Sequence, residues 1–227
     1  MPAPTNESPS ATSEVTRLPG TPLAEAALEL IRPVETEPVF NHSVRSYLFA
    51  RLLAGDLGLS AGTDYDDDLL FTACVLHDSG VAGDSPRRQR FEVEGADRAA
   101  GFLLGQGRST SEADEVWQAI ALHSSTGIAN RRGTLCMLVR EGVALDFGGV
   151  MGDQHAGVVT DAQAAAVHAV YPRLNMVGSL VDAIVAHGAA NPANAPRYSV
   201  PGELLRERQE YGRTRMEHAF RVSRWGN

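Results

Sequence analysis

Residues 71–80 read FTACVLHDSG, an apolar run that ends in a histidine, an aspartate and a Ser-Gly turn. Leu70, Cys74 and His77 follow one another at steps of four and three, which place their side chains on one face of an α-helix. The pattern predicts a helix over residues 65–77 whose apolar face carries His77 into the core. A polar side chain buried at such a position needs a partner.

Two other polar residues have the same kind of setting. His42 lies in FNHSVRSYLF, residues 40–49, and Asp146 follows the apolar stripe of REGVALDFGG, residues 140–149. Imidazoles and carboxylates together form a mixed N/O ligand set that suits zinc, iron or manganese. We therefore predict a shared divalent metal held by His42, His77, Asp78 and Asp146. The alternative is that separate His–Asp pairs buttress a helix bundle.

The rest of the chain is typical of helices. Apolar residues recur at three- and four-residue steps, and period-two runs rich in Val, Ile and Thr are nearly absent. We predict an all-α bundle in residues 21–227, with the last helix as an extension that covers the core or mediates self-association, and a flexible Pro/Ser/Thr-rich leader in residues 1–20. The predicted helices span residues 21–31, 40–54, 65–77, 94–105, 111–123, 133–144, 161–171, 175–187 and 201–219.

Composition excludes several functions. The 227 residues carry a net charge of -8, which argues against binding to nucleic acid or an anionic membrane. All 20 basic residues are arginine, so the chain has no lysine for a P-loop or a Schiff base. The two cysteines lie in apolar runs and are expected to stay reduced, and no apolar stretch is long enough to cross a bilayer. We expect a cytoplasmic protein that acts on a small molecule.

The order of the four polar residues resembles the HD-domain metalloprotein superfamily: an early His, a His-Asp pair that closes an apolar helix, and a late Asp. The resemblance covers roughly residues 40–150. FNHSVRSYLFA, RFEVEGADRAA, ALHSSTGIA, ALDFGG and SVPGELLRER further resemble the cyanamide hydratase (urea hydro-lyase) branch. This resemblance implies one Zn²⁺ on the four residues, with Fe²⁺ or Mn²⁺ as alternatives, and a metal-bound hydroxide that adds to a nitrile-like carbon. Cyanamide would give urea.

Two alternatives stay open. One is an HD-type phosphohydrolase acting on a nucleotide, which predicts arginines directed at the phosphate. It is weakened because no acid lies three or four residues after Asp78, where nucleotidase relatives place a catalytic glutamate. His123 is the only histidine between Asp78 and Asp146, which favours a single metal. The other alternative is a non-catalytic HD-like binding module.

The catalytic candidates are Asp78 and His123. Besides binding the metal, Asp78 is a candidate to accept a proton from the water, and His123 to deliver one to the substrate nitrogen. The competing hypothesis for His123 is a helix-terminal histidine that interacts with the helix dipole.

The candidate substrate contacts are Phe40, Asn41, Arg45, Glu92 and Thr126. The structural alternatives are core packing for Phe40, support of a ligand carboxylate for Arg45 and Asn41, and a helix-terminal charge for Glu92. Glu92 is also an alternative to His123 as the proton donor. For Arg45 the salt bridge to a ligand carboxylate is the favoured interpretation. Thr126 belongs to the segment after His123 that we expect to form a wall of the site.

Overall fold

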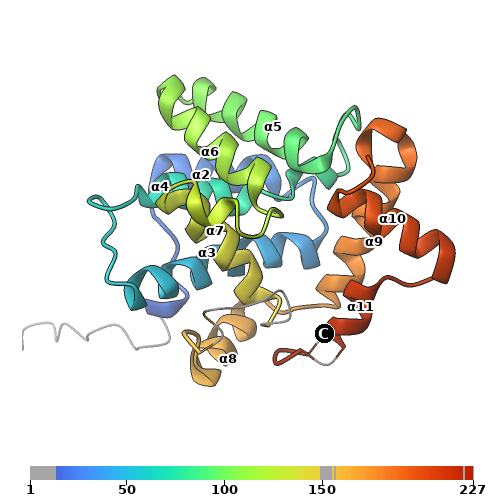
Figure 1. Ribbon diagram of the computed structural model, residues 1–227. Helices are drawn as coiled ribbons and strands as arrows, with labels where there is room; N and C mark the ends of the chain where they lie inside the picture. The colour runs from blue at the N-terminus through green and yellow to red at the C-terminus, as the bar shows by residue number, and fades with distance from the viewer. Residues whose placement is uncertain (1–13, 149–154, 156, 222, 227) are drawn as a thin grey trace, which may run out of the picture.

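The computed structural model describes residues 14–148, 155, 157–221 and 223–226. These residues form ten α-helices, three short 3-10 helices and no strand, so the all-α prediction is confirmed (Figure 1). Of the predicted leader, residues 1–13 lie outside the described residues. The helices are α2 (Pro22–Ile31), α3 (Glu37–Asp56), α4 (Asp67–Leu76), η1 (Ser79–Val81), α5 (Phe91–Gly105), α6 (Thr110–Leu122), η2 (Ala129–Arg131), α7 (Thr134–Asp146), α8 (Asp161–Val170), α9 (Met176–Ala190), η3 (Pro192–Asn194), α10 (Val200–Tyr211) and α11 (Arg215–Phe220).

The first eight predicted helices match α2 to α9 within a few residues. The single helix predicted over residues 201–219 is wrong, because the chain forms α10 and α11 there. Gly212 ends α10 with a φ of 74°, a left-handed conformation that glycine adopts without steric cost. Thr214 then starts α11 through a capping box with Glu217.

Helix α3 occupies the middle of the molecule and packs against α4, α7, α8 and α9 (Figure 1). Its contact with α7 is very close at Gly142, where an added Cβ would lie 2.3 Å from the backbone oxygen of Ser46. Only a residue without a side chain allows this approach. The contact brings the end of α7, with Asp146, beside the first turns of α3, with His42 and Arg45.

The buried apolar residues form two clusters. The larger one fills the space among α2 to α7 and also takes in Val159 and two residues of α8. The smaller one joins Val39, Phe91 and the end of α7 to α9, α10 and α11, which lie together on one side of the bundle (Figure 1). The candidate site lies at this second junction. Within the described part of the chain, no helix has both the length and the hydrophobicity needed to span a membrane.

Candidate metal centre

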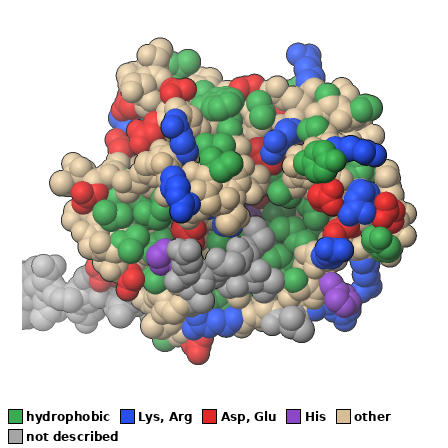
Figure 2. Space-filling model, in the orientation of Figure 1, with side chains coloured by type: hydrophobic (Ala, Val, Ile, Leu, Met, Phe, Trp, Pro, Cys, Tyr) green, Lys and Arg blue, Asp and Glu red, His purple; other side chains and the backbone are tan. Residues whose placement is uncertain are grey.

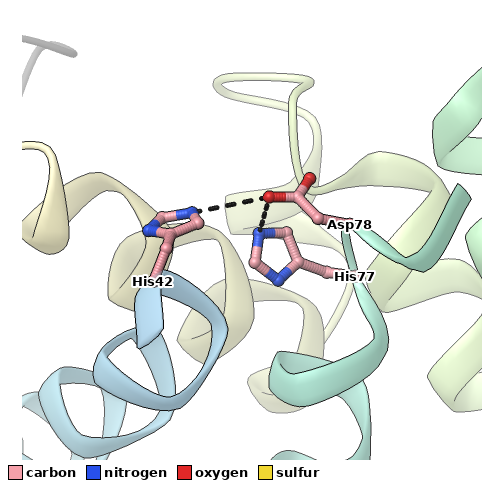
Figure 3. A group of neighbouring side chains, drawn as sticks. All are labelled: His42, His77 and Asp78. Carbon is pink, nitrogen blue, oxygen red and sulfur yellow. Dashed lines mark ion pairs between the residues drawn. The ribbon is translucent and has the colours of Figure 1, made fainter. Parts of the chain in front are cut away.

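Three buried side chains converge from two segments of the chain. His42 projects from α3, His77 is the C-cap residue of α4, and Asp78 follows it (Figure 3). The chain turns sharply after Asp78, and Gly80 permits this turn: a Cβ there would lie 1.9 Å from the backbone oxygen of Phe91. The turn therefore holds the His-Asp pair between the end of α4 and the start of α5.

The geometry of this group fits a divalent cation. His77 Nε2 lies 3.1 Å from Asp78 Oδ2, and His42 Nε2 lies 3.7 Å from the same oxygen. The three residues are at most 1% exposed, and none of these three atoms has a hydrogen-bond partner among the described residues. Buried polar atoms without partners are costly, and a shared metal ion would satisfy all three. In the described part of the chain, this is the one group of three such side chains close enough to hold a metal.

Hydrogen bonds on the opposite side of each ring fix the imidazoles. His77 Nδ1 donates to the backbone oxygen of Cys74 at 2.7 Å. Because a carbonyl can only accept, the proton of neutral His77 is on Nδ1, and Nε2 presents its lone pair to the group. The Nδ1 atom of His42 is likewise 2.6 Å from Asp146 Oδ2. Metal-binding histidines are commonly oriented in this way.

The electrostatics of the group favour an ionised Asp78 and a neutral His42. Burial raises the pKa of Asp78, but the neighbouring histidines, His77 first, more than offset it and hold the pKa below its usual value. Burial lowers the pKa of His42. Both residues are therefore in the protonation state that binds a metal. Burial lowers the pKa of His77, but the Asp78 carboxylate more than offsets it and raises this pKa, so a metal would displace a proton from His77 on binding.

The predicted ligand Asp146 has a different place. Both of its oxygens bond to the guanidinium of Arg45, at 2.7 Å from Nε and 2.8 Å from Nη2, and it also contacts the Nδ1 side of His42. Arg173 donates to the backbone oxygen of Asp146 at 2.7 Å. In this structure Asp146 orients His42 and lies outside the three-residue group, and its role as a fourth ligand stays a prediction.

His123 lies next to the metal-binding group. It is the C-cap residue of α6 and is 5% exposed, and its Nε2 is 3.9 Å from Asp78 Oδ1. Its Nδ1 donates to the backbone oxygen of Ile120 at 2.6 Å, so Nε2 is the free acceptor of the neutral ring. Burial, followed by the charge of His77, lowers the pKa of His123 to about 4.

A cavity of about 570 Å³ opens onto His42, His77, Asp78 and His123. Its walls are mostly apolar and come from Phe91, the end of α7 and the three helices α9 to α11. Figure 2 shows hydrophobic side chains in a recess right of centre, with charged side chains along its right-hand rim. Arg215 is the one arginine among the described residues that line the cavity.

A comparison with family models matches residues 39–148 to the HD domain. An HD domain is therefore found at residues 39–148. The match includes all four residues of the predicted motif, and members of this family are typically metal-dependent enzymes, often phosphohydrolases. A comparison with curated proteins found no match.

Three of the predicted substrate contacts, Phe40, Asn41 and Arg45, do not line the cavity. Phe40 and Asn41 face a separate groove beside Tyr171, and the Asn41 amide donates to the backbone oxygen of Pro172 at 2.9 Å. Arg45 is fully buried and its guanidinium pairs with Asp146.

The other two predicted contacts, Thr126 and Glu92, are also absent from the residues that line the cavity. Thr126 accepts a hydrogen bond from Arg140. Glu92 is buried and accepts one at 2.8 Å from Ser124, which does line the cavity. Glu92 therefore reaches the cavity only through Ser124.

One part of the cavity wall is formed by residues that follow the HD domain in the sequence, and these were not among the predicted site residues. Leu180 and Ile184 of α9, Leu204 of α10, and Met216 and Phe220 of α11 line the cavity. Two signals for this wall are present in the sequence. Leu180 and Ile184 follow a four-residue step on one helical face, and Thr214-x-x-Glu217 is a capping box that starts a separate last helix.

Proposed function

We propose that this protein is a metal-dependent hydratase that adds water across the carbon–nitrogen triple bond of a nitrile-like substrate. Cyanamide to urea is the simplest such reaction. The observation that carries the proposal is a metal-binding group at the wall of a mostly apolar cavity, because an uncharged nitrile needs a nucleophile and no counter-ion. We propose Zn²⁺ as the metal, with Fe²⁺ or Mn²⁺ also compatible with the N/O ligand set.

His42, His77 and Asp78 would hold the metal, since their buried atoms have no other hydrogen-bond partner among the described residues. A bound divalent metal supplies Lewis acidity, which lowers the pKa of a coordinated water toward about 7. Asp146 and Arg45 keep the His42 ring in position, and the backbone oxygen of Cys74 does the same for His77.

His123 is proposed to move the proton. Its neutral ring presents Nε2 to the cavity beside Asp78 Oδ1. Nε2 would take a proton from the attacking water and return it to the nitrile nitrogen, with the Asp78 carboxylate stabilising the imidazolium that forms in between. One water is added in total, and the reaction needs no other reactant.

The phosphohydrolase alternative rests on the family, in which such activity is common. Recognition of a phosphate usually needs cationic donors directed at it. Arg215 is 3.3 Å from Glu207 through its Nε and has a side chain that is 90% exposed, while Arg45 is directed at Asp146. The cavity therefore supports a hydratase better than a nucleotidase.

The test combines metal analysis with two assays on one purified sample: urea formation from cyanamide and phosphate release from a panel of mononucleotides. We expect about one zinc per chain and urea formation. His77→Ala should lose both the metal and the activity, whereas the matched control His218→Ala, on the exposed side of α11, should keep both. Phosphate release without urea formation would replace the proposal by the nucleotidase, and a protein without metal or activity would indicate a binding module.

A further inference from the structure

The cavity is much larger than cyanamide. Cyanamide has only three non-hydrogen atoms, whereas the cavity measures about 570 Å³, and a water molecule takes up roughly 30 Å³ in the liquid. Cavities of about 300–1,000 Å³ are typical of sites that enclose molecules of many more atoms. With cyanamide bound, most of the apolar wall would remain in contact with water.

The wall is apolar from the metal-binding group to the rim. The rings of Phe147 and Phe91 contact His42 and His123, with centroids 5.0 and 5.7 Å apart, and Val143 and side chains of α9 to α11 complete the apolar surface. Several of these residues also belong to the second buried cluster, so the wall is part of the packed core. Such a surface binds an apolar group by removing it from water.

The charged residues at the rim are already paired. Glu203 lies 2.9 Å from Arg206, and Glu207 lies 3.3 Å from Arg215 and also accepts the backbone N–H of Arg215 at 2.8 Å. Arg206 also pairs with Glu210 at 2.7 Å, so both rim arginines are engaged by carboxylates and the rim offers no unpaired cation to an anionic ligand. Together with the apolar wall, this favours an uncharged molecule.

An aromatic side chain stands at the same rim. Tyr198 lines the cavity, is 93% exposed and has a φ of 64°, a left-handed conformation that is uncommon for a residue other than glycine. Backbone strain of this kind is found preferentially at functional sites. Tyr198 is placed to contact a substrate that extends from the metal-binding group to the rim.

We infer that the substrate is an uncharged N-cyano or nitrile compound whose reactive end meets the metal-binding group and whose apolar body fills the cavity up to the rim. The identity of the reactive end rests on the proposed function. The apolar body follows from the cavity alone.

The first test compares cyanamide, benzylcyanamide and 4-carboxybenzylcyanamide as substrates of the metal-loaded protein. We expect kcat/KM for benzylcyanamide to exceed that for cyanamide by on the order of tenfold or more, since a well-filled apolar pocket discriminates strongly by size. The carboxylate analogue should fall well below benzylcyanamide. Equal or lower activity on benzylcyanamide than on cyanamide would overturn the inference.

A pair of variants locates the effect in the cavity. Ala219→Phe, in α11, would place a ring in the cavity and should lower the preference for benzylcyanamide over cyanamide by about tenfold. Ala165→Phe makes the same change on the exposed side of α8, away from the cavity, and should leave the preference unchanged. An equal change of preference in both variants would contradict the cavity assignment.

A binding experiment separates this inference from the proposed function. The uncharged fluorophore N-phenyl-1-naphthylamine should bind at one site per chain, more weakly to Ala219→Phe, and be displaced by benzylcyanamide but not by cyanamide. If the protein binds the fluorophore in this way but hydrates none of the cyanamides, the proposed function is overturned and the inference of an apolar substrate body is supported. Hydration of cyanamide without probe binding would overturn the inference and leave the proposed function standing.

Discussion

At the scale of single residues, the site depends on hydrogen bonds to the Nδ1 side of the histidine rings, opposite the Nε2 atoms that face the metal-binding group. Asp146 connects Arg45 and His42, and all three residues are fully buried. The Asp146 carboxylate stays ionised because, although burial raises its pKa, Arg45 and His42 lower it well below the usual value. A charged carboxylate at this place holds the His42 ring with Nε2 toward Asp78.

Asp146→Asn should therefore weaken metal binding without abolishing it. We expect a loss of about 10–100-fold in zinc affinity, the effect typical of residues that orient a ligand. A competition titration against a chromophoric chelator measures this. The control Asp182→Asn, at an exposed salt bridge on α9, should leave the affinity unchanged. Complete loss of zinc, as expected for His77→Ala, would show that Asp146 is a direct ligand after all.

A second buried carboxylate stabilises the loop before α5. Glu94 accepts hydrogen bonds from Ser85 Oγ at 2.8 Å and from the backbone N–H groups of Arg87, Arg88 and Gln89. Burial raises the pKa of Glu94, and these hydrogen bonds, that of Arg88 first, more than offset it, so the folded-state pKa lies below 4.5. The carboxylate thus contributes stability above pH 4.5 that is lost as the pH falls through its folded-state pKa.

Glu94→Gln should lower the free energy of unfolding at pH 7 by about 1.5–3 kcal/mol, the range for hydrogen bonds to a charged group. The difference from wild type should narrow at pH 3, because the wild-type carboxylate is then losing its charge. Urea denaturation at both pH values measures the difference in the free energy of unfolding. Glu29→Gln, on the exposed face of α2, is the control. A difference of the same size at both pH values would contradict the assigned role of the charge.

At the scale of elements, the contact between α3 and α7 sets the distance from His42 and Arg45 to Asp146. Gly142→Ala would force the new methyl group against the Ser46 backbone and the Ala50 side chain. We expect a destabilisation of about 1–3 kcal/mol from overpacking, even though alanine is the better helix former. In the control Gly101→Ala, on α5, the added Cβ meets nothing within 4 Å, so a gain of about 0.5–1 kcal/mol is expected. Thermal denaturation of both variants measures these changes in stability. A Gly142→Ala variant more stable than wild type would contradict the close contact.

At the scale of the whole molecule, metal binding should stabilise the fold, because the three ligand residues come together only when α3 and α4 pack. Zinc at 100 times its dissociation constant would add about 2.7 kcal/mol and raise Tm by about 5–11 °C for a chain of this size. Calorimetry before and after treatment with EDTA, and again after zinc is restored, measures the shift. His77→Ala serves as the control without a shift, and an EDTA-insensitive wild-type Tm would contradict a metal bound by the folded state.

Local patterns in the sequence were enough to predict the all-α fold, the positions of α2 to α9 and the motif of the HD domain. These features are local: a helix is specified by apolar steps of three and four, and His77-Asp78 is specified by its place at the end of such a run. The separation of α10 from α11 was also encoded locally, in Gly212 and the Thr214 capping box, but one long helix was predicted there.

Three features depend on long-range packing: the contacts of Asp146, the location of the predicted substrate contacts and the wall of the cavity. Asp146 meets Arg45 and His42 across about a hundred residues of chain, and α9 to α11 reach the HD domain through packing rather than through any local pattern. A periodic pattern indicates which face of a helix is buried, but not which helix covers it. The volume and charge of the cavity, and with them the kind of substrate it admits, depend on that packing.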